Sequence, residues 1–501
     1  MKSPTIGVGL TFFSELEPLF KSNRLVDFLE IEPQVFWKHT QRKPDVYEVD
    51  MEALASIKSF SQPKVFHSIG SLGGTHSPDL SQISPLLMMK KELQPLWISD
   101  HLSFNTASGP NALFKTGFLL PLRQNLESVK IAAKAITSMA NHLGAPLAVE
   151  TGVNYLRSRD DELMDGEFVG AVADAANCGL LLDMHNIWTN QLNGRQPVDE
   201  FLHQIPLDRV WEVHMAGGFE EDGYWLDAHS GEIQKEMLDI SKQVIPILPN
   251  LRAITFEIYP SFISKVGLEV IRKQLKTVRR LWELRGKKLT SKPPSTLQRC
   301  RKIKTKVDAN SISPTEWENT LGALVVGQNS YGNLAKELAV DPGITLYTKL
   351  ITSFRASMVV RILKLTSRLI LLNMGKESFS KMLESYWLEH TPELFASDEA
   401  EGFARYLRNI HLDLPFLNEV IEFEMATLAT TLHGKTHVVS FPYDPFPVLL
   451  ALAQGKLPDS PASDHVELEI TPDDPIVTGD SIGNISTLTN KYGLREIVWH
   501  H

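Results

Sequence analysis

Metal-binding residue types recur along the first half of this 501-residue chain, each at or just after the end of a short apolar run. The candidates for a metal site are His67, Asp100, His101, Glu150, Asp183, His185, Asn186, His214, Asp227, His229 and Glu257. Imidazoles and carboxylates without a thiolate suit iron, zinc or manganese. Gathered in one place, they would be costly to desolvate without a cation. We therefore expect a metal centre in which Glu150, Asp183 and His214 are catalytic and Glu150 bridges two ions.

A single histidine or aspartate at the end of a strand is more often a hydrogen-bonded loop residue than a ligand. Coincidence does not explain the set, because ionisable residues end six successive runs that are otherwise apolar. Asp100 has an alternative role as a partner that orients a neighbouring histidine. Glu30 and Glu32 share one face of the second run, where a structural ion pair and a substrate contact are both open.

The elements that must position these residues are eight apolar runs, which are typical of parallel strands buried on both faces. They cover residues 5–10, 26–32, 64–69, 96–101, 146–151, 179–185, 209–215 and 253–259. Amphipathic stretches separate them, the clearest at 122–143, which Gly144 follows as a helix end predicts. Eight such units predict an α/β fold, a TIM (β/α)₈ barrel, in which all strand ends meet at one face. An open doubly wound sheet would normally have a glycine-rich loop after its first strand, and Thr11-Phe12-Phe13 is not one.

The chain is longer than one hydrophobic core usually serves, so more than one domain is expected. We expect the barrel at residues 1–285, a basic, proline-containing linker at 286–312, and a domain at 313–501 that is mainly helical α+β. Helical patterns dominate as far as residue 429. Short β-like pieces follow at 437–441, 465–470 and 475–478.

Composition bounds the class of protein. Hydrophobic residues make up 43% of the chain and charged residues 22%, and no apolar run reaches membrane-spanning length. The start of the sequence lacks the apolar core of a signal peptide, and two cysteines cannot form a disulfide framework. These features favour a cytoplasmic protein with no membrane partner. The net charge of −10 argues against nucleic acid as a partner, and the basic residues between 287 and 306 fit a solvated linker.

The segments that carry these residues resemble the multinuclear non-heme iron-dependent oxidative enzymes (MNIO), the family that includes the methanobactin biosynthesis oxidase. The matching segments are residues 7–10, 28–30, 67–73, 99–103, 120–122, 149–150, 183–186, 212–217, 227–229 and 257. Together they span nearly all of the first 285 residues. The resemblance implies a TIM barrel with two or three iron ions and molecular oxygen as co-substrate. It also implies natural-product biosynthesis in which a Cys, Asp or Asn residue of a ribosomally made precursor peptide is modified.

Residue by residue, the family's metal positions fall on His67, Asp100, His101, Glu150, Asp183, His214, Asp227, His229 and Glu257. Two positions depart from the pattern. Many members have Asp-x-Asn-Asn where this chain has Asp183-Met184-His185-Asn186, which leaves open whether His185 or Asn186 faces the metal. Many have Glu-Asn where this chain has Glu150-Thr151, and we expect that change to alter substrate contacts.

The C-terminal part is similar to the partner proteins that bind the precursor peptide beside these oxidases. The similarity lies in residues 379–392, 403–407, 414–417 and 422–424. It implies a recognition partner fused in the same chain, which would raise the effective concentration of peptide at the barrel. A leader peptide could add to the small sheet as a further strand. Phe441, Tyr443 and Phe446 are candidate peptide contacts, with ordinary core packing as the alternative.

Other functions fit the same barrel. Endonuclease IV-like phosphodiesterases hold zinc there, and xylose-isomerase-like sugar enzymes hold two divalent ions. A DNA-repair enzyme would need a basic groove, whereas residues 217–222 after the seventh run read Gly-Gly-Phe-Glu-Glu-Asp. A peptide-binding or metal-binding module without activity is the third alternative. We expect iron-dependent oxidation of a precursor peptide.

Overall fold

The computed structural model describes residues 4–21, 25–40, 43–70, 72–110, 112–287 and 312–472. Two compact units divide the chain. The first comprises Met1–Leu113, Phe118–Leu324 and Asn329–Tyr347, and the second comprises Phe114–Gly117, Val325–Gln328 and Thr348–His501. The β-like piece at 475–478 and the expected linker, apart from its ends, lie outside the described residues.

Eight parallel strands of the first unit close into a barrel, in the order β1, β14, β11, β10, β9, β6, β5, β2. They are β1 (Gly7–Thr11), β2 (Phe28–Ile31), β5 (Lys64–Ser68), β6 (Ile98–His101), β9 (Leu147–Glu150), β10 (Gly179–Asp183), β11 (Val210–Met215) and β14 (Ala253–Phe256). The ring follows the sequence order of these strands. The TIM-like barrel predicted from the sequence is therefore confirmed.

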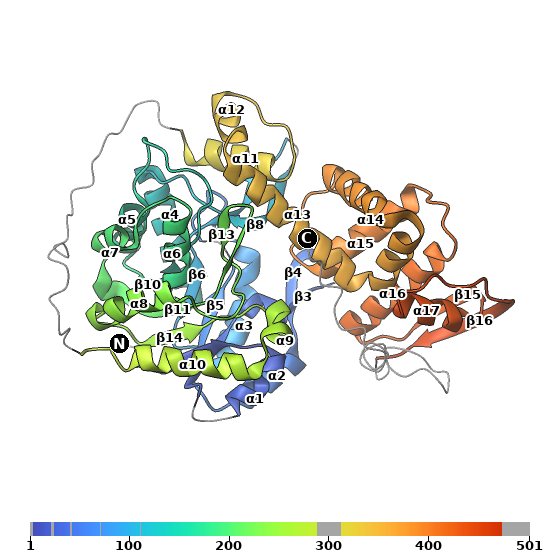
Figure 1. The fold of residues 1–501 in the computed structure, drawn as a ribbon, viewed down its shortest axis with the longest axis horizontal. Helices are drawn as coiled ribbons and strands as arrows, with labels where there is room; N and C mark the ends of the chain where they lie inside the picture. Colours follow the sequence, from blue (N-terminus) through green and yellow to red (C-terminus); the bar gives the residue numbers. More distant parts are fainter. Residues whose placement is uncertain are drawn as a thin grey trace. The chain divides into compact units, whose positions relative to one another are not determined.

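Helices cover the outside of the barrel. They include α3 (Ile83–Leu93), α4 (Leu126–Leu143), α5 (Asp165–Ala176), α6 (Met184–Leu192), α7 (Val198–Gln204), α8 (Lys235–Val244) and α10 (Leu268–Trp282). Figure 1 shows α4, α5, α7 and α10 outside the strands. Helix α4 begins four residues later than its apolar pattern predicts, because the Asn125 side chain accepts a 2.8 Å hydrogen bond from Ser128 N and caps it there. It ends at Gly144, which takes a left-handed φ of 54°.

Three hairpins extend the loops that leave the barrel strands. They are β3 (Trp37–Thr40) with β4 (Lys43–Val49), β7 (Phe104–Ser108) with β8 (Leu113–Leu120), and β12 (Phe219–Glu221) with β13 (Tyr224–Leu226). Each follows a barrel strand directly or after a short turn, so it leaves from the face where the strands end. The sequence patterns did not predict these hairpins.

The first unit continues past the expected domain boundary at residue 313. It includes most of α11 (Pro314–Val325), all of α12 (Asn333–Ala339) and the start of α13 (Pro342–Ile362). The side chain of Trp317 is 2% exposed and donates from Nε1 to Pro121 O at 2.9 Å. The Glu318 carboxylate accepts from Thr75 N at 2.9 Å. These contacts join α11 to the loops that follow the barrel strands, so the boundary lies at Tyr347 rather than at 313.

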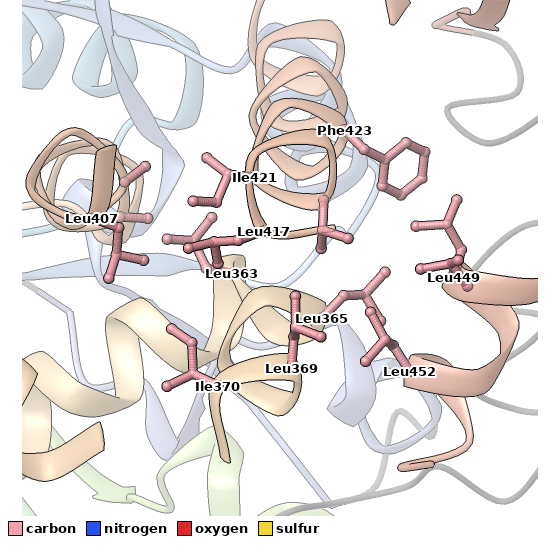
Figure 2. Packing of buried hydrophobic residues seen from close by; sticks show 14 of the residues in the cluster. Leu363, Leu365, Leu369, Ile370, Leu407, Leu417, Ile421, Phe423, Leu449 and Leu452 are labelled. Carbon is pink, nitrogen blue, oxygen red and sulfur yellow. The ribbon is translucent and has the colours of Figure 1, made fainter. Parts of the chain in front are cut away.

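The second unit is mainly helical. It contains the rest of α13, α14 (Lys364–Glu389), α15 (Ala396–Asn409), α16 (Leu417–His433), α17 (Pro445–Ala453), and the antiparallel pair β15 (His437–Tyr443) and β16 (Ser463–Ile470). Figure 2 shows its leucine-rich core, in which Leu365 and Leu369 of α14 lie with Leu452 of α17. No helix in the described part of the chain is long and apolar enough to cross a membrane.

The aromatic residues predicted to contact a peptide lie in or against this core. Phe441 is 1% exposed and Tyr443 is 8% exposed, because alternation along β15 turns both toward the helices. Phe446 packs against the same cluster and is partly buried. Phe441 and Tyr443 are therefore corrected to core residues, and only Phe446 keeps a partly accessible side chain.

Candidate metal centre

Strand ends bring most of the predicted ligands together inside the barrel. His67 lies near the end of β5, while His101, Glu150 and Asp183 are the last residues of β6, β9 and β10. His214 lies near the end of β11, and Glu257 directly follows β14. The last two predicted ligands, Asp227 and His229, follow β13. All of these except His101 and Asp227 are buried.

Glu150 lies between three histidines. Its Oε2 atom is 2.5 Å from His101 Nδ1 and 3.4 Å from His67 Nε2. Its Oε1 atom is 3.6 Å from His214 Nδ1. The two carboxylate oxygens thus face different imidazoles, as expected of a carboxylate that bridges two ions.

The candidate ligands form a row along the strand ends, and Glu257 continues this row on the side of His214 away from Glu150. Its Oε2 atom is 2.9 Å from His214 Nδ1 and 3.6 Å from His229 Nε2. One ligand atom from each of Glu150, Asp183, His214 and Glu257 lies within 4.8 Å of the others. These four side chains form the centre of the site, and they include the three predicted catalytic residues.

The far end of the row is formed by Asp227 and His229. Asp227 Oδ1 lies 2.8 Å from His229 Nε2 and 3.8 Å from His185 Nε2. The Tyr259 ring stacks on the His229 imidazole, with 4.6 Å between ring centroids and 26° between planes. The candidate ligands therefore form one continuous series from His67 to Asp227.

Unpartnered atoms test whether a metal fits. Six buried atoms of the row have no hydrogen-bond partner among the described residues: Glu150 Oε2, Asp183 Oδ2, His214 Nδ1, Asp227 Oδ1, His229 Nε2 and Glu257 Oε2. Three contacts between facing atoms in the row are shorter than 3 Å, so carboxylate and imidazole atoms converge on shared space. Such atoms are costly to bury unless a cation occupies that space. The donor set fits iron, zinc or manganese.

The pKa shifts of these residues reflect the same cost of burying several charged groups together. Burial, together with Glu150 and Glu257, raises the pKa of the Asp183 carboxyl well above its usual range. Burial alone would lower the pKa of His101, but Glu150 outweighs it and raises the value to about 9. At His67 burial prevails and lowers the pKa to about 4. Protons on some groups thus balance the buried carboxylates, and bound cations would displace those protons.

Two inner contacts set which imidazole nitrogen faces the row. Glu30 Oε2 lies 2.8 Å from His214 Nε2, and Ser99 Oγ lies 2.9 Å from His67 Nδ1. The nitrogen of each ring that faces the carboxylates is the other one. Of the two roles left open for Glu30, the structure shows the ion pair, and its partner is His214. The sequence did not indicate this partner.

Asp100 is corrected, because it does not join the cluster. Alternation along β6 turns Ser99 and His101 into the barrel and Asp100 outward. Asp100 Oδ2 accepts from Gly70 N at 3.2 Å and lines a small cavity with Leu86 of α3 and Met139 of α4. Its carboxylate holds the loop after β5.

His185 and Asn186 lie in the first turn of α6. His185 is fully buried near Asp227, with Nε2 3.3 Å from Leu226 O and Nδ1 without a partner among the described residues. The backbone N–H of Asn186 donates to Asp183 Oδ1 at 2.9 Å, and this bond turns the second Asp183 oxygen toward the row. Neither side chain belongs to the tight group around Glu150 and Glu257.

A family model described as "RiPP precursor modification enzyme MbnB/TglH/ChrH" matches residues 5–258. The chain belongs to this family. The match spans the barrel strands and the ligand series described above, and it confirms the family resemblance read from the sequence. It does not extend to the segment after residue 258.

Relatives of the chain include UPF0276 proteins from several bacteria. The chain is 29% identical to one from Chromobacterium violaceum over 184 residues, which are 36% of this chain and 65% of the relative. It is 28% identical to one from Streptomyces avermitilis over 193 residues, which are 38% and 40% of the two chains. A relative from Acinetobacter baylyi is 28% identical over 259 residues, 50% of this chain and 85% of its own. The chain thus spans less than two thirds of the first two relatives.

Among solved structures, D-psicose 3-epimerase from Clostridium cellulolyticum H10 matches with a TM-score of 0.37 and 10% identity. The match covers 56% of this chain and 99% of that one. The IOLI protein with a bound zinc atom matches with a TM-score of 0.37 and 13% identity, over 55% of this chain and 98% of that one.

Proposed function

We propose that the chain is an iron- and oxygen-dependent enzyme that oxidises a Cys, Asp or Asn residue in a ribosomally made precursor peptide. One observation carries the proposal. A row of buried carboxylate and imidazole atoms without hydrogen-bond partners ends the barrel strands, in a chain that belongs to a RiPP precursor modification family.

The row would hold two or three ions. Glu150 would be shared between an ion held by His67 and His101 and one held by His214 and Asp183. Glu257 would be shared between the latter and an ion held by Asp227 and His229. Carboxylate bridges of this kind keep neighbouring cations together and offset their repulsion.

Iron in such a donor set supplies electron transfer and oxygen activation when it is bound. The protein's own groups do the rest. Glu30 and Ser99 hold His214 and His67 in one orientation, and Asn186 does the same for Asp183. Burial of Glu150 and His214 keeps water away from the centre of the row. A rigid, dry site of this kind favours reaction at one bound peptide residue.

Recognition of the peptide is assigned to the second unit, as the fused counterpart of a separate partner protein. The proposal rests on its sequence similarity to such partners. The β15–β16 pair provides strand edges to which an extended peptide could add. Phe446 packs against the core of this unit and remains partly accessible.

A phosphodiesterase is less well supported. The β12–β13 hairpin carries exposed Glu220 and Asp222 beside the strand that leads to Asp227. Their negative charge would repel a phosphate backbone. An acidic loop is compatible with a peptide.

Metal analysis with a peptide assay tests the proposal. Protein purified without added metal is expected to hold two or three equivalents of iron. With oxygen, it should change the mass of a peptide encoded by a short reading frame beside the gene, and it should consume oxygen as it does so. Stoichiometric zinc with hydrolysis of phosphodiesters, and no change in the peptide, would contradict the proposal.

A further inference from the structure

The loop that supplies Asp227 and His229 has a strained backbone. His229 has a φ of 41°, in the left-handed region that residues other than glycine rarely adopt. Such a conformation is unfavourable for an L-residue, and it persists only where surrounding contacts hold it. Ser230 N donates to Gly217 O at 2.7 Å, and Tyr259 N donates to His229 O at 3.0 Å. These bonds hold the loop at and after His229.

Tyr155 holds the same loop before His229. Its hydroxyl oxygen accepts a 2.9 Å hydrogen bond from the backbone amide of Asp227. Tyr155 lies in the loop after β9, five residues beyond Glu150, and its side chain is 4% exposed. The bond acts on the backbone of a proposed ligand, two residues before the strained His229. Tyr155 therefore helps to decide where the Asp227 carboxylate points.

Tyr155 is itself held by the segment that follows the linker. Its amide donates to the Tyr347 hydroxyl at 3.2 Å, and the two rings pack edge to face with centroids 5.4 Å apart. Tyr347 is fully buried in the first unit. A Cβ on Gly343 would lie 2.4 Å from Tyr155 O, so the start of α13 approaches this loop as closely as glycine allows. The Arg157 amide also donates to Asp341 Oδ2 at 3.0 Å.

We propose that Tyr155 positions the Asp227 end of the metal centre and that Tyr347 positions Tyr155. The site then depends on chain that lies beyond residues 5–258 of the family match. The inference rests on the proposed metal centre and adds to it residues that touch no metal. If the two tyrosines only packed in the core, their rings would suffice and their hydroxyl groups would have no role. Here both hydroxyl oxygens accept from backbone amides, and one of those amides belongs to a proposed ligand.

Anaerobic titration of the metal-free full-length protein with Co²⁺, followed by its visible spectrum, tests the inference. The variants are Tyr155→Phe and Tyr347→Phe, which keep the rings and remove the hydroxyls. Tyr224→Phe is the matched control, because the Tyr224 ring also packs edge to face on Tyr155, with centroids 6.1 Å apart. Positional support of this kind is expected to change affinity about tenfold or more. We expect both tyrosine variants to lose Co²⁺ affinity by this factor at one class of sites, the class that includes Asp227. The Co²⁺ affinity of the other sites, and of all sites in Tyr224→Phe, should not change.

Epistasis separates positioning from general stability. In an Asp227→Asn background, Tyr155→Phe should cause no further loss of Co²⁺ affinity, because the ligand that it positions is already altered. Unchanged isotherms for both tyrosine variants would overturn the inference and leave the metal centre intact. Equal weakening of all sites together with a lower melting temperature would also overturn it. A wild-type protein that binds no Co²⁺, Fe²⁺ or Zn²⁺ would overturn the metal centre itself.

Discussion

Glu30 Oε2 lies 2.8 Å from His214 Nε2, and neither side chain has any solvent exposure. The contact leaves His214 Nδ1 facing Glu257 Oε2 at 2.9 Å, in the middle of the ligand row. Thr11 Oγ1 donates to the second Glu30 oxygen at 3.1 Å and fixes the carboxylate in turn. A carboxylate on the remote nitrogen fixes the ring orientation and makes the other nitrogen a better ligand.

Glu30→Ala should therefore weaken metal binding without removing any ligand. We expect affinity to fall by about ten- to a hundredfold, the usual effect of losing such a partner. Glu30→Gln should fall less, because its amide oxygen can still accept from a protonated Nε2. Titration of the metal-free protein with Fe²⁺ measures both variants. Equal affinity for wild type and Glu30→Ala would mean that the contact does not set the orientation of His214.

Glu150→Ala should abolish activity and lower the metal content by more than one ion. Both oxygens of Glu150 face imidazoles, so its loss would remove a ligand from two ions and leave the repulsion between them uncompensated. Elemental analysis and peptide turnover are the measurements. Asp100→Ala is the control, since Asp100 lies outside the barrel and should leave the metal content unchanged. Normal metal content and turnover in Glu150→Ala would remove Glu150 from the site.

His185→Asn should keep the fold and the metal content. His185 Nε2 lies 3.8 Å from Asp227 and close to a backbone carbonyl, outside the tight group of ligand atoms. The substitution also introduces the asparagine that many members of the family have at this position. Melting temperature and iron content measure the outcome, with altered activity as the expected change. Loss of an ion would instead identify His185 as a ligand.

The sequence predicted the barrel well, because its strands are buried on both faces and read as short apolar runs. Predicted and observed strands agree within a few residues, as at β9 (Leu147–Glu150) against the run at 146–151. The domain boundary could not be predicted. Composition changes near residue 313, whereas α11 belongs to the barrel unit through tertiary contacts such as Trp317 with Pro121. Such contacts leave no local pattern.

The sequence predicted which side chains would cluster where strand order alone determines proximity, as for Glu150, His214 and Glu257. Asp100 was placed wrongly, although the alternation of β6 already turns it away from its neighbour His101. Tyr155 gave no signal, because its role depends on a loop whose path the sequence does not specify. Phe441 and Tyr443 were candidate peptide contacts with core packing as the alternative, and their alternation along β15 fits the core-facing alternative.

Glu424 should make the second unit less stable as the pH rises. It accepts from Leu365 N and Thr366 N at the start of α14, and burial raises its pKa from 4.5 to about 7 despite these bonds. A raised carboxyl pKa gives a contribution that is complete below pH 4.5 and is lost as the pH passes 7. The difference corresponds to about 3 kcal/mol.

Calorimetry of wild type and Glu424→Gln between pH 4 and 8 tests this. Glutamine cannot ionise, so the wild type should lose stability relative to the variant across that range. Glu422→Gln is the control, because Glu422 is exposed on the same helix and should not change the pH slope. A constant difference between wild type and Glu424→Gln at every pH would mean that Glu424 does not titrate in this range.

Arg355→Ala should separate the roles of the two units in the full-length chain. Arg355 is 2% exposed, donates from Nε to Glu399 Oε1 at 2.7 Å, and donates from Nη2 to His390 O at 2.9 Å. Removing one partner of a buried ion pair leaves the other charge uncompensated and costs about 3–5 kcal/mol. We expect the second unit to unfold at a lower temperature while the iron content of the first stays the same.

If the second unit recognises the precursor, Arg355→Ala should raise KM for the full-length peptide at least tenfold at temperatures where that unit is unfolded. The value of kcat at saturating peptide should change much less, because the metal centre is intact. Arg361→Ala, exposed on the same helix, is the control and should leave KM unchanged. Calorimetry establishes that the second unit has unfolded in the variant. An unchanged KM under those conditions would mean that the barrel unit recognises the peptide by itself, so that the similarity of the second unit to partner proteins does not extend to their role.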